Sequence, residues 1–240
     1  MFIYDNMIEA IFIKRPNRFI AHCLLGNEEV KVHVKNTGRC KELLIPGARV
    51  YLQSNDDPNR KTKYSLISVQ KGERLINMDS QVPNKVVFQA LSNNLITLPG
   101  VTEEITHLKA EQTYEQSRFD FYFETKTQKG FIEVKGVTLE EDGIVLFPDA
   151  PTQRGLKHIY ELIEAKKEGY LAYIFFLIQM DDVKYFTPNI KTHKEFSQAL
   201  THAKTQGVEI LVYDSLVTKE GIQINRPVEY RAAPLTNDTP

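Results

Sequence analysis

The sequence predicts two domains, a small all-β domain followed by a larger α/β domain with a mixed sheet. Residues 1–81 form a series of short segments rich in β-branched and aromatic residues, separated by turn signals, without a convincing helix between them. From residue 82 onward the hydrophobic period changes, and amphipathic helices alternate with apolar strands. We therefore expect an OB-like barrel over 1–81, with a small open sandwich as the alternative, and a mixed sheet flanked by helices over 82–240.

The strands of the first domain are expected between consecutive turns. Arg15-Pro16-Asn17, Gly26-Asn27 and Pro46-Gly47 are typical turn sequences. The predicted strands cover 10–14, 19–25, 30–34, 49–53, 65–69 and 75–78.

The second domain contains segments with the hydrophobic period of a helix and segments with that of a strand. Helices are predicted over 85–92, 152–168 and 192–206, and Leu156, Ile159, Tyr160 and Ile163 give the middle helix its apolar stripe. Gly169 stands where a C-terminal cap belongs. The continuous apolar run 170–178 indicates a central strand covered on both faces. Further strands are predicted over 117–123, 131–135, 144–147, 183–186 and 208–212.

Composition excludes several classes of protein. The two cysteines form no CxxC pair and have no His/Cys spacing suited to zinc, and no phosphate-binding glycine motif suggests a nucleotide cofactor. The longest apolar run is too short for a bilayer, so we expect a cytoplasmic protein without membrane contact. Net charge is −1, but residues 1–81 carry net +4 and the rest net −5. This split suits one domain that binds phosphates and another that presents carboxylates.

Asp120, Glu133 and Lys135 are the candidate catalytic residues. The segment 117–123 alternates strictly, which places Asp120 on one face with Arg118 and Tyr122, and Glu133 and Lys135 share a face of the next strand. Carboxylates on neighbouring strands suit Mg²⁺ or Mn²⁺, and a lysine beside them can orient a water or stabilise phosphoryl charge. The alternative is a solvated cross-strand ion pair. The surrounding strands and helix resemble the PD-(D/E)xK nuclease core.

Blocks spread along the chain resemble the sugar fermentation stimulation protein (SfsA) family. These are Arg15-Pro16-Asn17-Arg18-Phe19, Asn36-Thr37-Gly38-Arg39, Pro46-Gly47-Ala48, Pro83-Asn84, Ser117-Arg118-Phe119-Asp120-Phe121, the run from Phe131 to Leu139, the run from Phe147 to Gly155, His158 and Glu161-Leu162. The resemblance implies an OB-like domain, a nuclease-like domain, association with nucleic acid and a link to sugar utilisation, notably of maltose. It also implies Glu111 as a helical carboxylate that completes the metal shell with Asp120 and Glu133.

Two segments are candidate nucleic-acid contacts. The loop formed by Asn36, Thr37, Gly38, Arg39 and Lys41 can present backbone N–H groups and two cations to phosphate, and Arg15 and Arg18 can extend this patch. Arg154 and His158 lie four residues apart on the predicted helix, on the side opposite Leu156, and can contact phosphate near the helix N-terminus. A solvated helix face is the alternative for this pair.

Two hypotheses follow from the sequence. The first is a nucleic-acid-binding protein that cleaves DNA, or alternatively RNA, with Mg²⁺ or Mn²⁺. The second is a DNA-binding regulator of sugar metabolism genes that uses a nuclease-like fold for binding without cleavage. The oligomeric state is open, and a dimer is compatible with the sequence.

Overall fold

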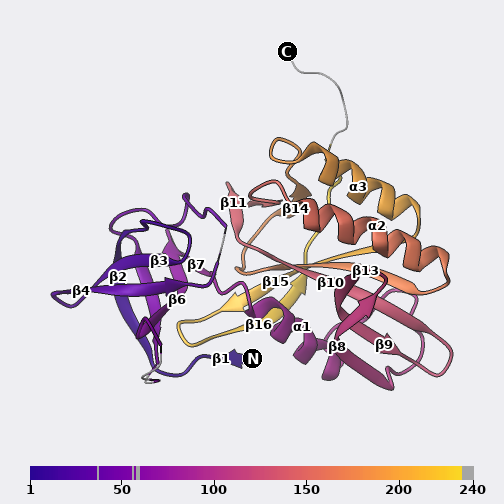
Figure 1. Cartoon of the computed structure of the whole chain (residues 1–240), viewed down its shortest axis with the longest axis horizontal. Helices are drawn as coiled ribbons and strands as arrows, with labels where there is room; N and C mark the ends of the chain where they lie inside the picture. Colours follow the sequence, from indigo (N-terminus) through magenta and orange to yellow (C-terminus); the bar gives the residue numbers. More distant parts are fainter. Residues whose placement is uncertain (37, 56, 58–59, 234–240) are drawn as a thin grey trace, which may run out of the picture.

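A barrel and a larger α/β domain lie side by side in the computed structural model, which describes residues 1–36, 38–55, 57 and 60–233 (Figure 1). The barrel uses six strands in the order β4-β3-β2-β5-β6-β7. Their bounds are β2 Met7–Lys14, β3 Ile20–Leu25, β4 Glu28–Val34, β5 Arg49–Ser54, β6 Tyr64–Lys71 and β7 Arg74–Asn77.

Parallel pairing of β4 with β6, from Val32 opposite Tyr64 to Val34 opposite Leu66, closes five of these strands into a barrel. Alternating residues such as Ala21, Cys23 and Val32 fill its interior and are fully buried. The predicted OB-like barrel is therefore confirmed, and the open sandwich is wrong.

The second domain is built on a seven-stranded sheet in the order β1-β16-β15-β13-β10-β9-β8. Its strands are β1 Phe2–Ile3, β8 His107–Tyr114, β9 Ser117–Glu124, β10 Lys129–Val137, β13 Leu171–Ile178, β15 Glu209–Val217 and β16 Gly221–Pro227. A smaller sheet, ordered β11-β12-β14, contains β11 Leu139–Glu141, β12 Ile144–Phe147 and β14 Tyr185–Pro188.

Helices cover both faces of the large sheet, as predicted. Helix α1 (Val82–Ser92) packs on one face, where Val86 and Val87 join a cluster with Phe121 and Phe175. Helices α2 (Gln153–Lys167) and α3 (Lys194–Thr205) pack on the other face (Figure 1). Strand β13 lies between β10 and β15 with both faces covered, which explains its continuous apolar sequence.

Two strands of the large sheet depart from the prediction. Strand β8 occupies 107–114, where we expected Glu111 on a helix. Strand β1 comes from the N-terminus, within the range assigned to the barrel, yet it pairs antiparallel with β16 at the edge of the large sheet. The chain therefore enters the second domain, builds the barrel, and returns to the second domain at α1.

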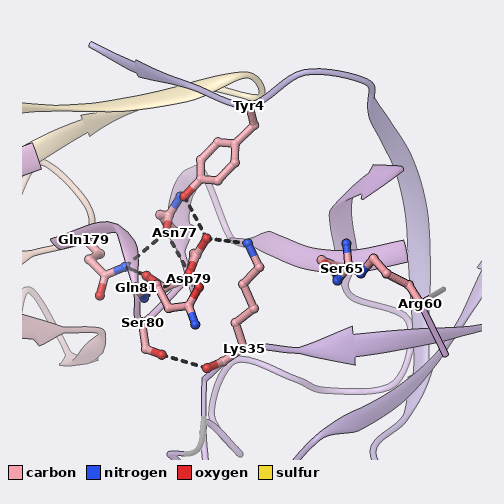
Figure 2. A network of polar contacts seen from close by, with 9 residues as sticks. All are labelled: Tyr4, Lys35, Arg60, Ser65, Asn77, Asp79, Ser80, Gln81 and Gln179. Atoms are coloured by element: carbon pink, nitrogen blue, oxygen red, sulfur yellow. Dashed lines mark hydrogen bonds and ion pairs between the residues drawn. The ribbon is translucent and has the colours of Figure 1, made fainter. Parts of the chain in front are cut away.

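A buried polar network joins the two domains at this return (Figure 2). Asp79 accepts hydrogen bonds from Lys35 Nζ at 2.8 Å and from Tyr4 Oη at 3.4 Å. Gln179, at the end of β13, donates to Asn77 Oδ1 at 3.0 Å and to the carbonyl of Asp79 at 3.1 Å. Because Tyr4, Asn77, Asp79 and Gln179 are buried and hydrogen-bonded to one another or to the half-buried Lys35, the network favours one relative placement of barrel and sheet.

Candidate functional site

Asp120 and Glu133 lie where two neighbouring strands separate. Strands β9 and β10 pair from Glu124 opposite Lys129 to Phe121 opposite Ile132, and the ladder stops at the next pair, which is Asp120 and Glu133. Asp120 Oδ2 accepts the backbone N–H of Val134 at 2.8 Å. A side-chain oxygen thus replaces the main-chain partner that the separating strand no longer provides.

The strict alternation predicted for 117–123 is broken at the same place. Phe119 contacts the ring of His158 on α2, with ring centroids 6.1 Å apart, whereas Phe121 contacts Phe88 on α1, with centroids 5.8 Å apart. Two side chains that strict alternation would place on one face therefore reach opposite helical layers. Asp120 lies between them.

Glu133 is the most deeply buried member of the site, with 3% of its side chain exposed. Its Oε1 accepts hydrogen bonds from Lys135 Nζ at 2.5 Å and from His158 Nδ1. Its Oε2 is buried and has no hydrogen-bond partner among the described residues. A buried carboxylate oxygen without a partner is costly, so this atom is suited to a ligand.

The two carboxyl groups have opposite pKa shifts. Burial alone would raise the pKa of Glu133, but the hydrogen bond from His158 and the charge of Lys135 outweigh burial and hold that pKa below its usual range. Burial raises the pKa of Asp120, and the negative charge of Glu133 raises it further. The two carboxylates are therefore neighbours at the position where the β9–β10 ladder stops.

Asn84 is a site residue whose role the sequence reasoning missed. It lies in the first turn of α1 and donates its amide to Asp120 Oδ1 at 2.7 Å. In the sequence, the Pro83-Asn84 pair is only one of the blocks that resemble the family, next to the start of the second domain at residue 82. Because Asn84 follows the interdomain network by a few residues, the junction between the domains also holds Asp120.

Glu111 is not on a helix, and its carboxylate is not directed into a three-carboxylate cage. Its neighbours Ala110 and Gln112 pair with Phe121 and Phe119, so position 111 lies across the ladder from Asp120. However, its φ of 57° distorts the strand, and its exposed carboxylate approaches Arg118 at 3.4 Å. No group of three or more His, Cys, Asp or Glu side chains within the described residues is arranged to hold a metal ion.

The donor set of Asp120 and Glu133 nevertheless fits a hard divalent cation. Mg²⁺ uses one or two carboxylates and keeps several waters, so a third protein carboxylate is not required. The unpartnered Glu133 Oε2 supplies an oxygen whose burial a cation would compensate.

His158 is buried, contrary to the helix face predicted for it. The buried side of α2 contains Gly155, His158, Ile159, Leu162, Ile163 and Ala165, whereas Tyr160 is 50% exposed. His158 faces Glu133, and Arg154 Nε approaches its Nε2 at 3.5 Å. The imidazole thus stands between the buried Glu133 carboxylate and the Arg154 guanidinium. Arg154 itself is exposed.

The predicted loop of the barrel is organised by Arg15. Its guanidinium donates to four backbone carbonyls, those of Arg18, Asn36, Gly38 and Arg39, at 2.6–2.9 Å. Arg15 is therefore occupied by the loop and is not free for phosphate. Arg39 and Lys41 remain exposed, and Thr37 lies outside the described residues.

The described residues contain no helix that combines the length and the apolar character needed to cross a membrane. The fold and the site thus define a two-domain protein, an OB barrel joined to an α/β domain with a carboxylate–lysine–histidine site. The family models agree with this division. The model of the SfsA N-terminal OB domain matches residues 13–78, and that of the sugar fermentation stimulation protein RE domain matches residues 81–221.

The chain belongs to the sugar fermentation stimulation protein family. It is 58% identical over 228 residues to a sugar fermentation stimulation protein homolog of Clostridium beijerinckii, covering 94% of this chain and 98% of that protein. It is 57% identical over 220 residues to a homolog of Desulfitobacterium hafniense, covering 92% and 94%. The structure of Pyrococcus furiosus SfsA in complex with Ca²⁺ has a TM-score of 0.84 and 27% identity, covering 96% of this chain and 99% of that one.

Proposed function

We propose that the protein is a nuclease that hydrolyses phosphodiester bonds of DNA, or alternatively of RNA, with Mg²⁺ or Mn²⁺ as cofactor. The observation that carries this proposal is the Glu133 carboxylate. This carboxylate lies beside Asp120 and Lys135, it is buried, and its pKa is lowered. One of its oxygens has no hydrogen-bond partner within the described residues. A solvated ion pair of edge strands would have none of these properties.

Asp120 and Glu133 would hold the cation, with the Val134 carbonyl as a further oxygen donor. The cation supplies Lewis-acid stabilisation of phosphoryl charge when bound. The bound Ca²⁺ named for the Pyrococcus furiosus relative supports a divalent-cation site in this family.

The protein's own groups have separate tasks in this proposal. Lys135, with 17% of its side chain exposed, places its ammonium group next to Glu133. There the ammonium can orient a water or stabilise the negative charge that develops on the leaving group. Asn84 holds Asp120, and His158 holds Glu133. These contacts come from three different elements, so the carboxylates are fixed before a substrate arrives.

The test is an incubation of purified protein with end-labelled single-stranded and duplex DNA and RNA, in Mg²⁺, Mn²⁺ or EDTA. Wild type is compared with Glu133→Gln, Lys135→Met and the control Glu141→Gln, which changes an exposed glutamate of β11. We expect metal-dependent cleavage that falls at least about 100-fold in the first two variants and is unchanged in the control. Tight binding without cleavage on every substrate and metal would contradict the proposal and favour the regulator hypothesis.

A further inference from the structure

A cavity lies on the barrel, at its contact with the second domain. Its volume is about 730 Å³, within the range of small-molecule and cofactor sites. The wall comes from the end of β2, the following turn, the loop 38–46, and Ala150 and Pro151 of the second domain.

The lining of this cavity combines cations with apolar residues. Lys14, Arg18, Arg39 and Lys41 line it, and no acidic residue among those that the structure describes does. The side chains of Arg18, Arg39 and Lys41 have no hydrogen bond or ion pair with any other described residue. Phe12 and Leu44 also line the cavity and supply apolar surface. Cations without protein partners, beside apolar surface, suit a ligand that carries a phosphate and a flat apolar group.

The cavity is held open by contacts that do not involve these free cations. Arg15 fixes both flanking loops through its four carbonyl contacts. Gly38 is pressed against the second domain, because a Cβ at this position would lie 2.4 Å from Asp149 Oδ2. The ligand-facing groups are thus presented by loops that are already ordered, which lowers the cost of binding.

Helix α2 connects the rim of this cavity with the candidate site. Pro151 on its rim directly precedes Thr152, whose side chain caps α2 by accepting the Gly155 N–H at 3.0 Å. His158, which contacts Glu133, follows on the same helix. From Thr152 to His158 the helix rises roughly 10 Å. That length corresponds to about three stacked nucleotides of one strand.

We propose that this cavity binds one nucleotide of a nucleic-acid strand, about three nucleotides from the phosphodiester that reaches Glu133. The cations contact its phosphate, and the apolar lining residues Phe12 and Leu44 contact its base. This inference rests on the proposed function for its ligand. The same nucleotide chemistry is available from a free mononucleotide, and the experiment separates the two sources.

The chain contains no tryptophan, which permits a single-site fluorescence test. Ile45 is 56% exposed and stands between Leu44 and Pro46, which both line the cavity, so Ile45→Trp places a reporter at its rim. Leu95→Trp, at a 66% exposed position after α1, is the matched control. Both proteins are titrated in EDTA with a single-stranded 12-mer and with AMP, so that the result does not depend on cleavage.

We expect the 12-mer to quench the fluorescence of the Ile45→Trp reporter with saturation and to leave the fluorescence of Leu95→Trp unchanged. AMP should need at least a 100-fold higher concentration than the 12-mer for the same quenching. Arg18→Ser with Arg39→Ser should weaken binding of the 12-mer at least tenfold and lower the slope of log affinity against log salt by about 1.4. Lys126→Ser with Lys191→Ser, which removes two exposed lysines elsewhere, should change affinity less than twofold.

Three results would overturn the inference. Absence of quenching at Ile45→Trp would remove the cavity as a site, even if the protein binds and cleaves nucleic acid elsewhere. Equal affinity for AMP and the 12-mer would assign the cavity to a free nucleotide. Equal weakening by the Lys126/Lys191 control would show unspecific electrostatic attraction. Loss of the proposed nuclease activity alone, with quenching retained, would contradict the proposed function and leave this site intact.

Discussion

His158 of helix α2 and Glu133 of strand β10 form a hydrogen bond in the interior of the second domain, with 5% and 3% of their side chains exposed. The bond joins residues 25 positions apart and fixes the orientation of the carboxylate at the centre of the candidate site. Arg154 approaches the other ring nitrogen, so the histidine connects a solvent-exposed cation with a buried anion.

Replacement of His158 should test this relationship directly. His158→Leu removes the donor and leaves the Glu133 carboxylate with Lys135 alone, so we expect the free energy of unfolding to fall by about 2 kcal/mol. His158→Asn retains an amide donor near the position of Nδ1 and should recover more than half of that loss. Urea denaturation measures both, and His202→Leu, at an exposed position of α3, should change stability by less than about 0.5 kcal/mol. Equal losses in the Leu and Asn variants would show that packing, and not the hydrogen bond, is responsible.

The ion pairs of Glu140 should stabilise the contact between the domains in a pH-dependent way. Glu140 is 3% exposed and receives Lys71 at 2.7 Å and Arg74 at 3.1 Å from the barrel. Burial alone would raise its pKa, but the bond from Lys71, the Gly143 N–H and the charge of Arg74 outweigh burial and lower it. A lowered carboxyl pKa contributes stability above the unfolded value, near 4.3, and this contribution is lost as pH falls through the folded value.

We therefore expect Glu140→Gln to be about 2 kcal/mol less stable than wild type at pH 7. This value is lower than for a fully buried ion pair, because Lys71 and Arg74 are partly exposed and solvent screens their charges. The difference should shrink between pH 5 and pH 3, in chemical denaturation followed by circular dichroism. The exposed neighbour Glu141→Gln should show neither effect. A difference that stays constant with pH would contradict the assignment.

The two arginines of the first barrel turn should behave differently. Arg15→Met leaves four loop carbonyls without their guanidinium partner and should lower the free energy of unfolding by about 2 kcal/mol. Arg18→Met removes an exposed side chain without a partner among the described residues and should change stability by less than about 0.5 kcal/mol. Thermal denaturation of both proteins decides the point. Similar losses in the two variants would show that Arg15 does not organise the loops.

Asn84 should contribute to the protonation equilibrium of Asp120. Burial and the charge of Glu133 raise the pKa of Asp120, whereas the Val134 N–H, the charge of Lys135 and the amide of Asn84 lower it. Asn84→Ala should therefore move the carboxyl titration of Asp120 to higher pH, as measured by carbon NMR of the side-chain carboxyl. Asn93→Ala, which alters the other end of α1, should leave this titration unchanged. A titration that does not move in Asn84→Ala would show that the amide is not a significant partner in solution.

Local sequence patterns predicted the elements that carry the site, and long-range contacts decided how they meet. Period two in 117–123 and 131–135 predicted the strands of Asp120 and Glu133, because side-chain alternation is a local property. Position 111 was expected on a helix from the family resemblance alone. The strand that contains it is mostly exposed and carries little apolar alternation, so no local pattern indicated a strand there. His158 was placed on the solvent side because its polarity concealed that it continues the buried stripe of Gly155, Ile159 and Leu162.

The sequence by itself determined the two domains, the helix-covered sheet and the adjacency of Asp120 with Glu133-x-Lys135, since each follows from hydrophobic period and turn chemistry. For the first domain it left an OB-like barrel and an open sandwich as alternatives, and the parallel pairing of β4 with β6 decided for the closed barrel. Only the tertiary structure decided that β1 crosses to the second domain, that Asn84 reaches Asp120, that His158 reaches Glu133, and that Glu111 is paired with Arg118. These contacts join segments that are separate in the chain. They depend on how helices and strands pack, and no local pattern encodes that packing.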